Sequence, residues 1–377
     1  MNSDRAATWL QAWDSQGTHR TATHGDTAGA EWLEREATAL GAHVIVEAFA
    51  LDRIDPIACY LELSGSRIDG VPMFDAPTSG PDGIAGTLGS ITSDADIGVA
   101  ELSPQAVYTG EYRALREHAR HRGLVIICKG EQPGMGLLNA EQFRQPYGLP
   151  SIHVASDARD AVLAAANARL VARTSRTPSR AQNVVVGIPG RDRTRPPLVV
   201  MTPRSSWWQS TSERGGGLVC WLETVRALIA SPPSCDVVLT ANSGHELGHL
   251  GLDDFVARRP GWDRPIAQGG ATWIHYGANL GATGGKLSVV STADDLRAQA
   301  AAELTEAGQP PDTMVPKSLV PSGETRDIHR AGGRYLTLVG SNPLFHLPQD
   351  RWPHAVDVAA VARIANAATR MVVALTR

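Results

Sequence analysis

The sequence has few cysteines and no long apolar run. Its four cysteines lie far apart and form no C-x-x-C pair. That spacing argues against a disulfide framework and against a cysteine-ligated zinc site, and it favours a reducing cytoplasm. No apolar run approaches the roughly 20 residues needed to cross a bilayer. Residues 1–13 lack the basic start and apolar core of a secretory signal. We therefore expect a cytoplasmic protein without a membrane partner.

The sequence also has little excess charge of either sign. Its 35 Lys and Arg against 39 Asp and Glu give a formal net charge of −4. This balance provides no general attraction to nucleic acid, and the basic segment 112–123 (YRALREHARHRG) is short enough to be an exposed helix. Apolar residues make up 42% and charged residues 20%, which is typical of a globular protein. A length of 377 residues suggests two domains.

Two kinds of residue pattern alternate along the chain. Residues 51–182 contain short apolar runs broken by Gly, Pro, Ser and Asp, which predicts a small inserted β-rich domain ending in a linker at 174–180 (TSRTPSR). Residues 1–50 and 183–377 form the other predicted domain. There, buried-type strands such as 198–202 (LVVMT) and 236–241 (DVVLTA) alternate with helices. This order predicts an α/β fold, with a mostly parallel central sheet flanked by helices.

Metal-capable side chains follow several of these predicted strands. Catalytic groups in parallel α/β sheets lie beyond the carboxyl ends of the strands. Four of the 12 histidines and two glutamates fall in such places. They are His245, His249, His275, His346, Glu213 and Glu246. The sequence therefore predicts a functional site at one edge of the sheet.

Residues 245–249 (HELGH) also fit the H-E-x-x-H pattern of zinc proteases. That pattern works because two histidines four residues apart share one face of a helix. Here the string follows a strand after only three residues, and Gly248 and Gly251 would each weaken a helix by about 1 kcal/mol. Leu252 and Phe255 stand where an extended version of the motif needs Gly and His. We therefore favour a different interpretation.

The segment 236–256 (DVVLTANSGHELGHLGLDDFV) resembles the strand and Glu-Glu segment of zinc aminopeptidases. This superfamily includes bacterial leucyl aminopeptidase, aminopeptidase Y and glutaminyl cyclase. In it the second Glu binds metal and the first is the general base. The resemblance therefore implies that Glu246 is a metal ligand and that His245 stands in the position of the base. His249 falls on a family Leu and is either a pocket residue or a core histidine.

Other segments resemble the same superfamily in order and spacing. The string FHLPQD is similar to a terminal Tyr-His-Thr-Pro-x-Asp and makes His346 a metal ligand. The string SERGGG is similar to Asp-Asn-Ala-Ser-Gly and puts Glu213 in the place of a bridging Asp. In WIHY, His275 replaces a ligand Asp. The inserted region resembles a protease-associated domain that ends in YGLPSIHVAS.

One segment of this chain lacks the metal ligands that the family has there. The family's Ala-His-x-Asp-Ser should follow strand LVVM, but the sequence reads TPRSS, with Pro203 for the His and Ser205 for the Asp. The resemblance therefore implies one divalent transition metal, with zinc or manganese as the first candidates. The implied ligands are Glu213, Glu246 and His346, with His275 as a fourth ligand or an electrophile. Three protein ligands and an open position are the arrangement of a catalytic site.

The expected chemistry is hydrolysis by a metal-activated water. The metal would lower the pKa of that water, and His245 would accept its proton or orient it. Arg204 is a candidate to bind a substrate carboxylate, and Trp207 and Trp208 are candidates to form flat walls around an aromatic group. In RDIHRAGG, Asp327 and His329 are expected to line the pocket.

Three functions stay open at this point. The first is a hydrolase that cleaves a C–N bond of a small molecule or a short peptide, as an aminohydrolase of 5-nitroanthranilate does in this superfamily. The second is a general aminopeptidase, and the third is a non-catalytic relative that binds a partner. We expect a homo-oligomer, because the protease-associated insert often contributes to assemblies in this family.

Overall fold

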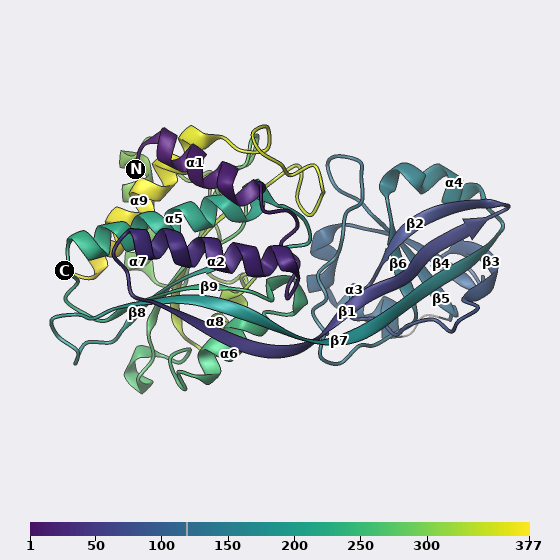
Figure 1. The fold of residues 1–377 in the computed structure, drawn as a ribbon, viewed down its shortest axis with the longest axis horizontal. Coiled ribbons are helices and arrows are strands. Elements are labelled where there is room, and N and C mark those ends of the chain that lie inside the picture. The colour runs from purple at the N-terminus through teal and green to yellow at the C-terminus, as the bar shows by residue number, and fades with distance from the viewer. Residues whose placement is uncertain (118–119) are drawn as a thin grey trace.

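The computed structural model describes residues 1–117 and 120–377. Two long antiparallel strands, β1 (Val44–Leu63) and β7 (Asn167–Ile188), run through both lobes of the molecule (Figure 1). Residues 174–180, predicted to be a linker, instead belong to β7 and pair with residues 50–56 of β1. Polar residues on a partly exposed two-stranded ribbon have the composition of a linker, so the pattern alone could not reveal the pairing.

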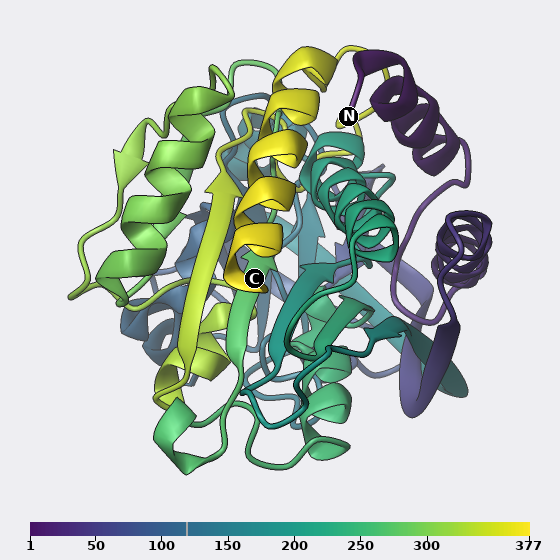
Figure 2. The same cartoon turned by 90° about the vertical axis from the view of Figure 1, so that its left-hand side faces the viewer.

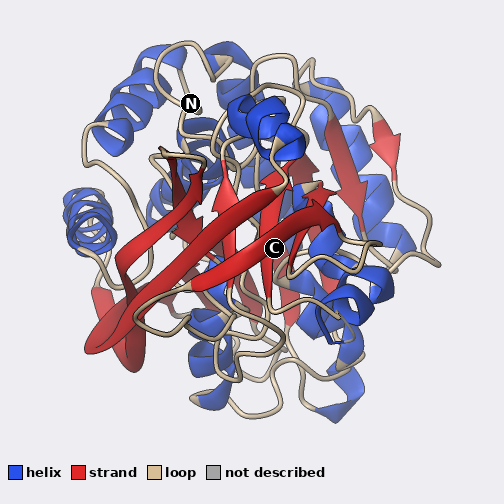
Figure 3. Ribbon diagram, turned by 90° about the vertical axis from the view of Figure 1, so that its right-hand side faces the viewer, coloured by secondary structure: helices blue, strands red, loops and turns tan. Residues whose placement is uncertain are grey.

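The second lobe is built around a closed ring of strands. Their order is β1-β2-β6-β5-β4-β3-β7, and β7 pairs with β1 to close the ring. Figure 3 views the molecule from the side of this lobe. The added elements are β2 (Ser66–Pro72), β3 (Ile84–Ser90), β4 (Ile97–Leu102), β5 (Gly123–Cys128), β6 (Ser151–Val154), α3 (Gly110–Glu117) and α4 (Arg159–Ala164). The basic segment 112–123 begins in α3, and its residues 118 and 119 lie outside the described part of the chain.

The first lobe contains the predicted α/β sheet. Its order is β7-β9-β8-β10-β13-β11-β12, in which β9, β8, β10 and β13 are mutually parallel. The strands are β8 (Leu198–Pro203), β9 (Val237–Asn242), β10 (Thr272–Tyr276), β11 (Leu287–Val290), β12 (Thr313–Met314) and β13 (Arg334–Gly340). The parallel strands are apolar almost throughout because helices cover both of their faces. The α/β prediction is therefore confirmed.

Helices cover this sheet on two sides (Figures 1 and 2). One side carries α1 (Ser3–Asp14), α2 (His24–Ala39), α5 (Thr211–Ala230), α7 (Asp294–Glu306) and α9 (Val358–Leu375). The other carries α6 (Leu250–Ala257) and α8 (Thr325–Arg330). By length and composition alone α9 could cross a membrane, but it packs against α5 and α7 in the core. Short 3₁₀ turns lie at Pro104–Tyr108, Ser156–Ala158, His245–Leu247 and Ile266–Gln268.

Two glycines bring the start of α5 close to the sheet edge. A Cβ at Gly216 would lie 1.9 Å from the carbonyl oxygen of Leu280, and one at Gly217 would lie 2.5 Å from Oγ1 of Thr202. Any side chain there would push the helix away. The glycine-rich start of α5 therefore fixes Glu213 and Arg214, one turn earlier, against the ends of the parallel strands.

Candidate functional site

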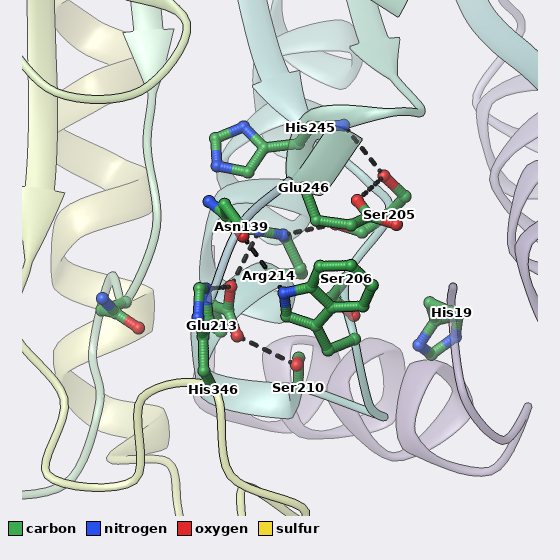
Figure 4. Close-up of polar contacts among 12 residues, drawn as sticks. His19, Asn139, Ser205, Ser206, Ser210, Glu213, Arg214, His245, Glu246 and His346 are labelled. Atoms are coloured by element: carbon green, nitrogen blue, oxygen red, sulfur yellow. Dashed lines mark hydrogen bonds and ion pairs between the residues drawn. The ribbon is translucent and has the colours of Figure 1, made fainter. Parts of the chain in front are cut away.

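The predicted site residues gather at the carboxyl edge of the parallel strands (Figure 4). Glu213 lies in the first turn of α5, after β8, and His245 begins the 3₁₀ turn that follows β9. His275 lies in β10, and His346 lies in the loop after β13. All four side chains are buried. The strand order of the sheet brings them to one edge although the sequence separates them widely.

Both carboxylate oxygens of Glu246 are hydrogen-bonded to residues outside the predicted ligand set. Its Oε1 accepts hydrogen bonds from the amide of Thr21 (2.9 Å) and from the hydroxyl of Thr21 (2.6 Å). Its Oε2 accepts from the hydroxyl of Ser205 at 2.5 Å (Figure 4). Ser205 is the residue that replaces the family's Asp. Both oxygens of Glu246 thus accept hydrogen bonds from neighbouring residues, and its role as a metal ligand stays a prediction.

Glu213 already has a cation beside it. Nη2 of Arg214 lies 2.8 Å from its Oε1, and the hydroxyl of Ser210 donates to its Oε2 at 3.0 Å. Nε2 of His346 lies 3.5 Å from the same Oε1 (Figure 4). Burial acts to raise the pKa of Glu213, but Arg214 and His346 outweigh it and lower the pKa to about 2. Glu213 is therefore a carboxylate whose countercharge is supplied by the next residue.

The second lobe holds part of this site in place. Nδ1 of His346 donates to the carbonyl of Leu137 at 2.7 Å. The amide of Ala140 donates to the carbonyl of Glu246 at 2.8 Å, and the indole of Trp207 donates to Oδ1 of Asn139 at 3.1 Å. Sequence reasoning missed this segment because it carries no ligand-type motif. Its role comes only from the contact between the lobes.

A second group lies around Glu324, which the sequence interpretation missed. Its Oε1 lies 3.7 Å from Nδ1 of His245, and its Oε2 lies 3.9 Å from Nε2 of His275. Among the described residues, none of these four atoms has a hydrogen-bond partner. Burial raises the pKa of Glu324 to about 7, although His249, in its protonated form, and Arg214 act in the opposite direction. Burial lowers the pKa of His275 to about 3 and that of His245 well below its usual value.

His249 belongs to the same group. Its ring lies 5.1 Å from that of His245, between centroids. Nδ1 donates to the carboxylate of Asp327 at 2.6 Å, while Nε2 has no partner among the described residues. Burial acts to lower the pKa of His249, but Asp327 outweighs it and raises the pKa. His249 and His346 both have a positive φ, 64° and 60°, which is strained for residues other than glycine.

A cleft of about 930 Å³ lies between the lobes. The second lobe contributes aromatic residues to it, and the first lobe contributes the loop before α8 and α8 itself. Representative lining residues are Tyr108, Tyr112, Tyr147, Val320, Arg326 and His329. Ser322 also lines it, two residues before Glu324. His329 therefore lies where the pocket prediction put it, and its Nδ1 is 3.1 Å from the hydroxyl of Tyr335.

The three residues predicted to bind substrate from the loop after β8 have structural contacts instead. Arg204 is buried, pairs with Asp26 at 2.8 Å and donates to the carbonyl of Gln182 at 2.7 Å. The ring of Trp207 stacks on Phe74 with centroids 4.8 Å apart. These contacts correct the roles expected for Arg204 and Trp207. The indole of Trp208, which is partly buried, donates to the carbonyl of His346 at 2.9 Å.

The predicted ligand set therefore does not assemble. Glu246 is occupied by hydroxyl and amide donors, Glu213 by Arg214, and His275 faces Glu324 rather than His346. In the part of the chain that the structure describes, no three His, Cys, Asp or Glu side chains are already close enough together to hold a metal ion. The four residues named from the sequence do not fit a shared metal.

Comparisons with known proteins identify the fold. No protein-family model and no curated protein sequence matches the chain. Among solved structures, a zinc aminopeptidase from Bacillus subtilis superposes with a TM-score of 0.81 at 14% identity, covering 100% of this chain and 95% of its own. The chain therefore has the zinc-aminopeptidase fold.

Two further structures extend this likeness. An aminopeptidase from Aneurinibacillus sp. strain AM-1 has a TM-score of 0.72 at 13% identity, covering 98% of this chain and 93% of its own. A glutaminyl cyclase from Tannerella forsythia has a TM-score of 0.53 at 10% identity, covering 98% and 97%. The zinc-aminopeptidase fold thus extends over both lobes.

Proposed function

We propose that this chain is a metal-dependent hydrolase that cleaves a C–N bond of a small molecule or short peptide in the cleft between the lobes. The observation that carries the proposal is the group of buried atoms of His245, His275 and Glu324 that have no partner among the described residues; Ser322 and Arg326, on either side of Glu324 in the sequence, line the cleft. Buried polar groups without partners are costly, and such groups collect at functional sites. The zinc-aminopeptidase fold, with relatives named for peptide hydrolysis, supports the same reaction class.

The chain supplies its own group for proton transfer. His249 is held by Asp327 through Nδ1, which leaves Nε2 as the basic atom. An imidazole hydrogen-bonded to a carboxylate is a stronger base than a free one, and its orientation is fixed. We assign to His249 the acceptance of a proton from the attacking water and its delivery to the leaving amine. His245, expected from the resemblance to stand in the position of the base, lies next to it.

The cleft favours a substrate with a planar apolar part and a negative charge. Tyr108, Tyr112 and Tyr147 line its second-lobe side, where aromatic rings can stack on a flat group. Arg113 and Arg330 lie on its walls and provide positive charge. The walls thus support an aromatic or similarly flat acid more than a broad range of peptides.

A substrate panel tests this function. The purified protein is offered amino-acid anilides, N-acyl amino acids and amino-substituted aromatic acids, before and after treatment with a chelator and again after zinc or manganese is restored. Release of amine or ammonia that disappears with the chelator and returns with the metal is expected. A protein that carries stoichiometric metal yet hydrolyses none of these substrates would argue against the proposal.

General aminopeptidase activity is the second candidate, because two of the superposed structures are named aminopeptidases. It predicts turnover of simple amino-acid anilides with little preference for an acid. The proposal above predicts the opposite order of rates, with the aromatic acids fastest. A Tyr108→Ala variant is expected to slow the aromatic substrates more than the anilides.

A further inference from the structure

Two buried histidines, His245 and His275, each bring an unpartnered ring nitrogen near a different carboxylate oxygen of the buried Glu324. These atoms are Nδ1 of His245, Nε2 of His275 and both carboxylate oxygens of Glu324. A Cβ at Gly323 would lie 3.6 Å from Cε1 of His245 and 4.0 Å from Cε1 of His275, so both rings border one small region beside Glu324. We propose that His245, His275 and Glu324 together hold one divalent transition-metal ion.

The spacing of the donor atoms suits a shared cation. The separations of 3.7 Å and 3.9 Å are too long for hydrogen bonds, which explains why the atoms have no partners. Donors around a tetrahedral zinc at about 2.0–2.1 Å lie roughly 3.3 Å from one another. Closing each pair by about half an ångström reaches that spacing, which small side-chain rotations provide. As they stand, the described side chains include no group of three His, Cys, Asp or Glu that could hold a metal ion, so the proposed site requires these rotations.

The charges also call for a cation at this place. Glu324 is fully buried, and its neighbours within ion-pair distance in the described chain are the imidazoles of His245 and His275, with no Lys or Arg among them. A buried carboxylate without a countercharge is expensive. Two neutral imidazoles and a carboxylate form a ligand set used by catalytic zinc, and they leave a fourth position open for water. Nδ1 of His275 lies 3.4 Å from the hydroxyl of Thr325, which orients the ring.

At the alternative position for a metal, the carboxylate already has a positively charged neighbour. Glu213 and His346 also face each other, at 3.5 Å, but Nη2 of Arg214 lies 2.8 Å from the same carboxylate oxygen. A metal there would have to displace a buried guanidinium whose Nε donates to the carbonyl of Ser205 at 2.7 Å. The inference therefore moves the metal from the residues indicated by the resemblance to a neighbouring triad, of which only His275 was an expected ligand.

This inference deepens the proposed function and rests on it for its catalytic meaning. With His245 as a ligand, the proton-transfer role falls to His249, whose ring lies beside it. The metal site itself can be tested without any substrate. Its outcome is therefore separable from that of the hydrolase proposal.

Metal content in four matched variants is the test. Each full-length variant is stripped with a chelator, titrated with Co²⁺ and then Zn²⁺, and measured by elemental analysis and by the visible spectrum of bound Co²⁺. Substitutions outside the ligand set commonly weaken metal binding by about 10–100-fold, so loss of a ligand should weaken it by more than about 100-fold. We expect this loss in Glu324→Gln and His275→Gln, while Glu246→Gln and His346→Gln keep one tightly bound metal.

The reverse pattern would overturn the inference: one metal retained in Glu324→Gln and lost in His346→Gln or Glu246→Gln. A parent chain that binds no metal would overturn it as well. Circular dichroism and thermal unfolding of the metal-free variants check their folding. If Glu324→Gln does not fold, His275→Gln and a His245→Gln variant decide the same question. Metal lost in Glu324→Gln, together with a metal-loaded parent that hydrolyses nothing, would leave the site standing and defeat the function.

Discussion

Two buried glutamates at the same sheet edge have opposite electrostatic surroundings. Glu213 and Glu324 each face an imidazole at 3.5–3.9 Å. Arg214 and His346 overcome the effect of burial and hold the pKa of Glu213 at about 2, whereas burial raises the pKa of Glu324 to about 7. The difference lies in the countercharge that each carboxyl group has nearby. One carboxylate has its cation built into the chain, and the other has none within ion-pair distance among the described residues.

The largest effect is expected from removing Arg214, the cation beside Glu213. Arg214→Met leaves the charge of Glu213 buried beside a neutral side chain. Breaking one partner of a buried ion pair costs about 3–5 kcal/mol. We expect a loss of that size in the free energy of unfolding, measured with urea. The matched double variant Arg214→Met/Glu213→Gln removes both charges of the pair and should recover most of the loss. An unchanged urea midpoint in the single variant would mean that the pair is not what keeps Glu213 charged.

The third buried glutamate of the site, Glu246, is held by hydrogen bonds rather than by a cation. In Glu246→Gln an amide group replaces one oxygen, while the backbone amide of Thr21 and the hydroxyl of Ser205 still need acceptors. An unsatisfied buried donor costs about 1–3 kcal/mol. We expect a drop of that size in unfolding free energy. Glu306→Gln, at a side chain that is 75% exposed, should change little. Equal effects in the two variants would contradict the buried network.

Acid titration compares the parent chain with a variant in which the side chain at position 213 is neutral. The folded-state pKa of Glu213, about 2, lies below its usual 4.5, so its ionised form favours the folded state. That contribution is present above pH 4.5 and is lost as the pH falls toward 2, at up to roughly 1.4 kcal/mol per pH unit. The melting temperature of Glu213→Gln should therefore fall less steeply than that of the parent between pH 4.5 and 2. Parallel curves would show that Glu213 does not carry this acid sensitivity.

The smallest effect is expected where a substitution removes a single hydrogen bond from the Arg214 side of the site. Trp208→Phe removes the donor to the carbonyl of His346, which is worth about 1 kcal/mol. Trp32→Phe makes the same truncation at an indole without a hydrogen-bond partner and serves as the control. We expect Trp208→Phe to lower stability more than the control, as measured by thermal unfolding, without changing metal content. A loss of metal would place the metal on the His346 side after all.

Local pattern was enough to predict the sheet. The runs LVVMT and DVVLTA became β8 and β9, since strands covered on both faces must be apolar almost throughout. The same logic predicted that His245 and His275 would reach one edge. It failed for residues 174–180, whose polar side chains on the ribbon of β1 and β7 have the composition of a linker.

The sequence by itself determined the α/β fold and the edge at which the polar side chains collect, because periodicity and strand order are local properties. Only the tertiary structure decided which of these side chains face each other. Arg214 neutralises Glu213, Thr21 and Ser205 occupy Glu246, and Glu324 meets His245 and His275. Apart from Arg214, which directly follows Glu213 in α5, these partners come from separate segments of the chain, and burial makes their charges matter. The spacing of residues along the chain gives neither the distances between these segments nor the burial of their side chains.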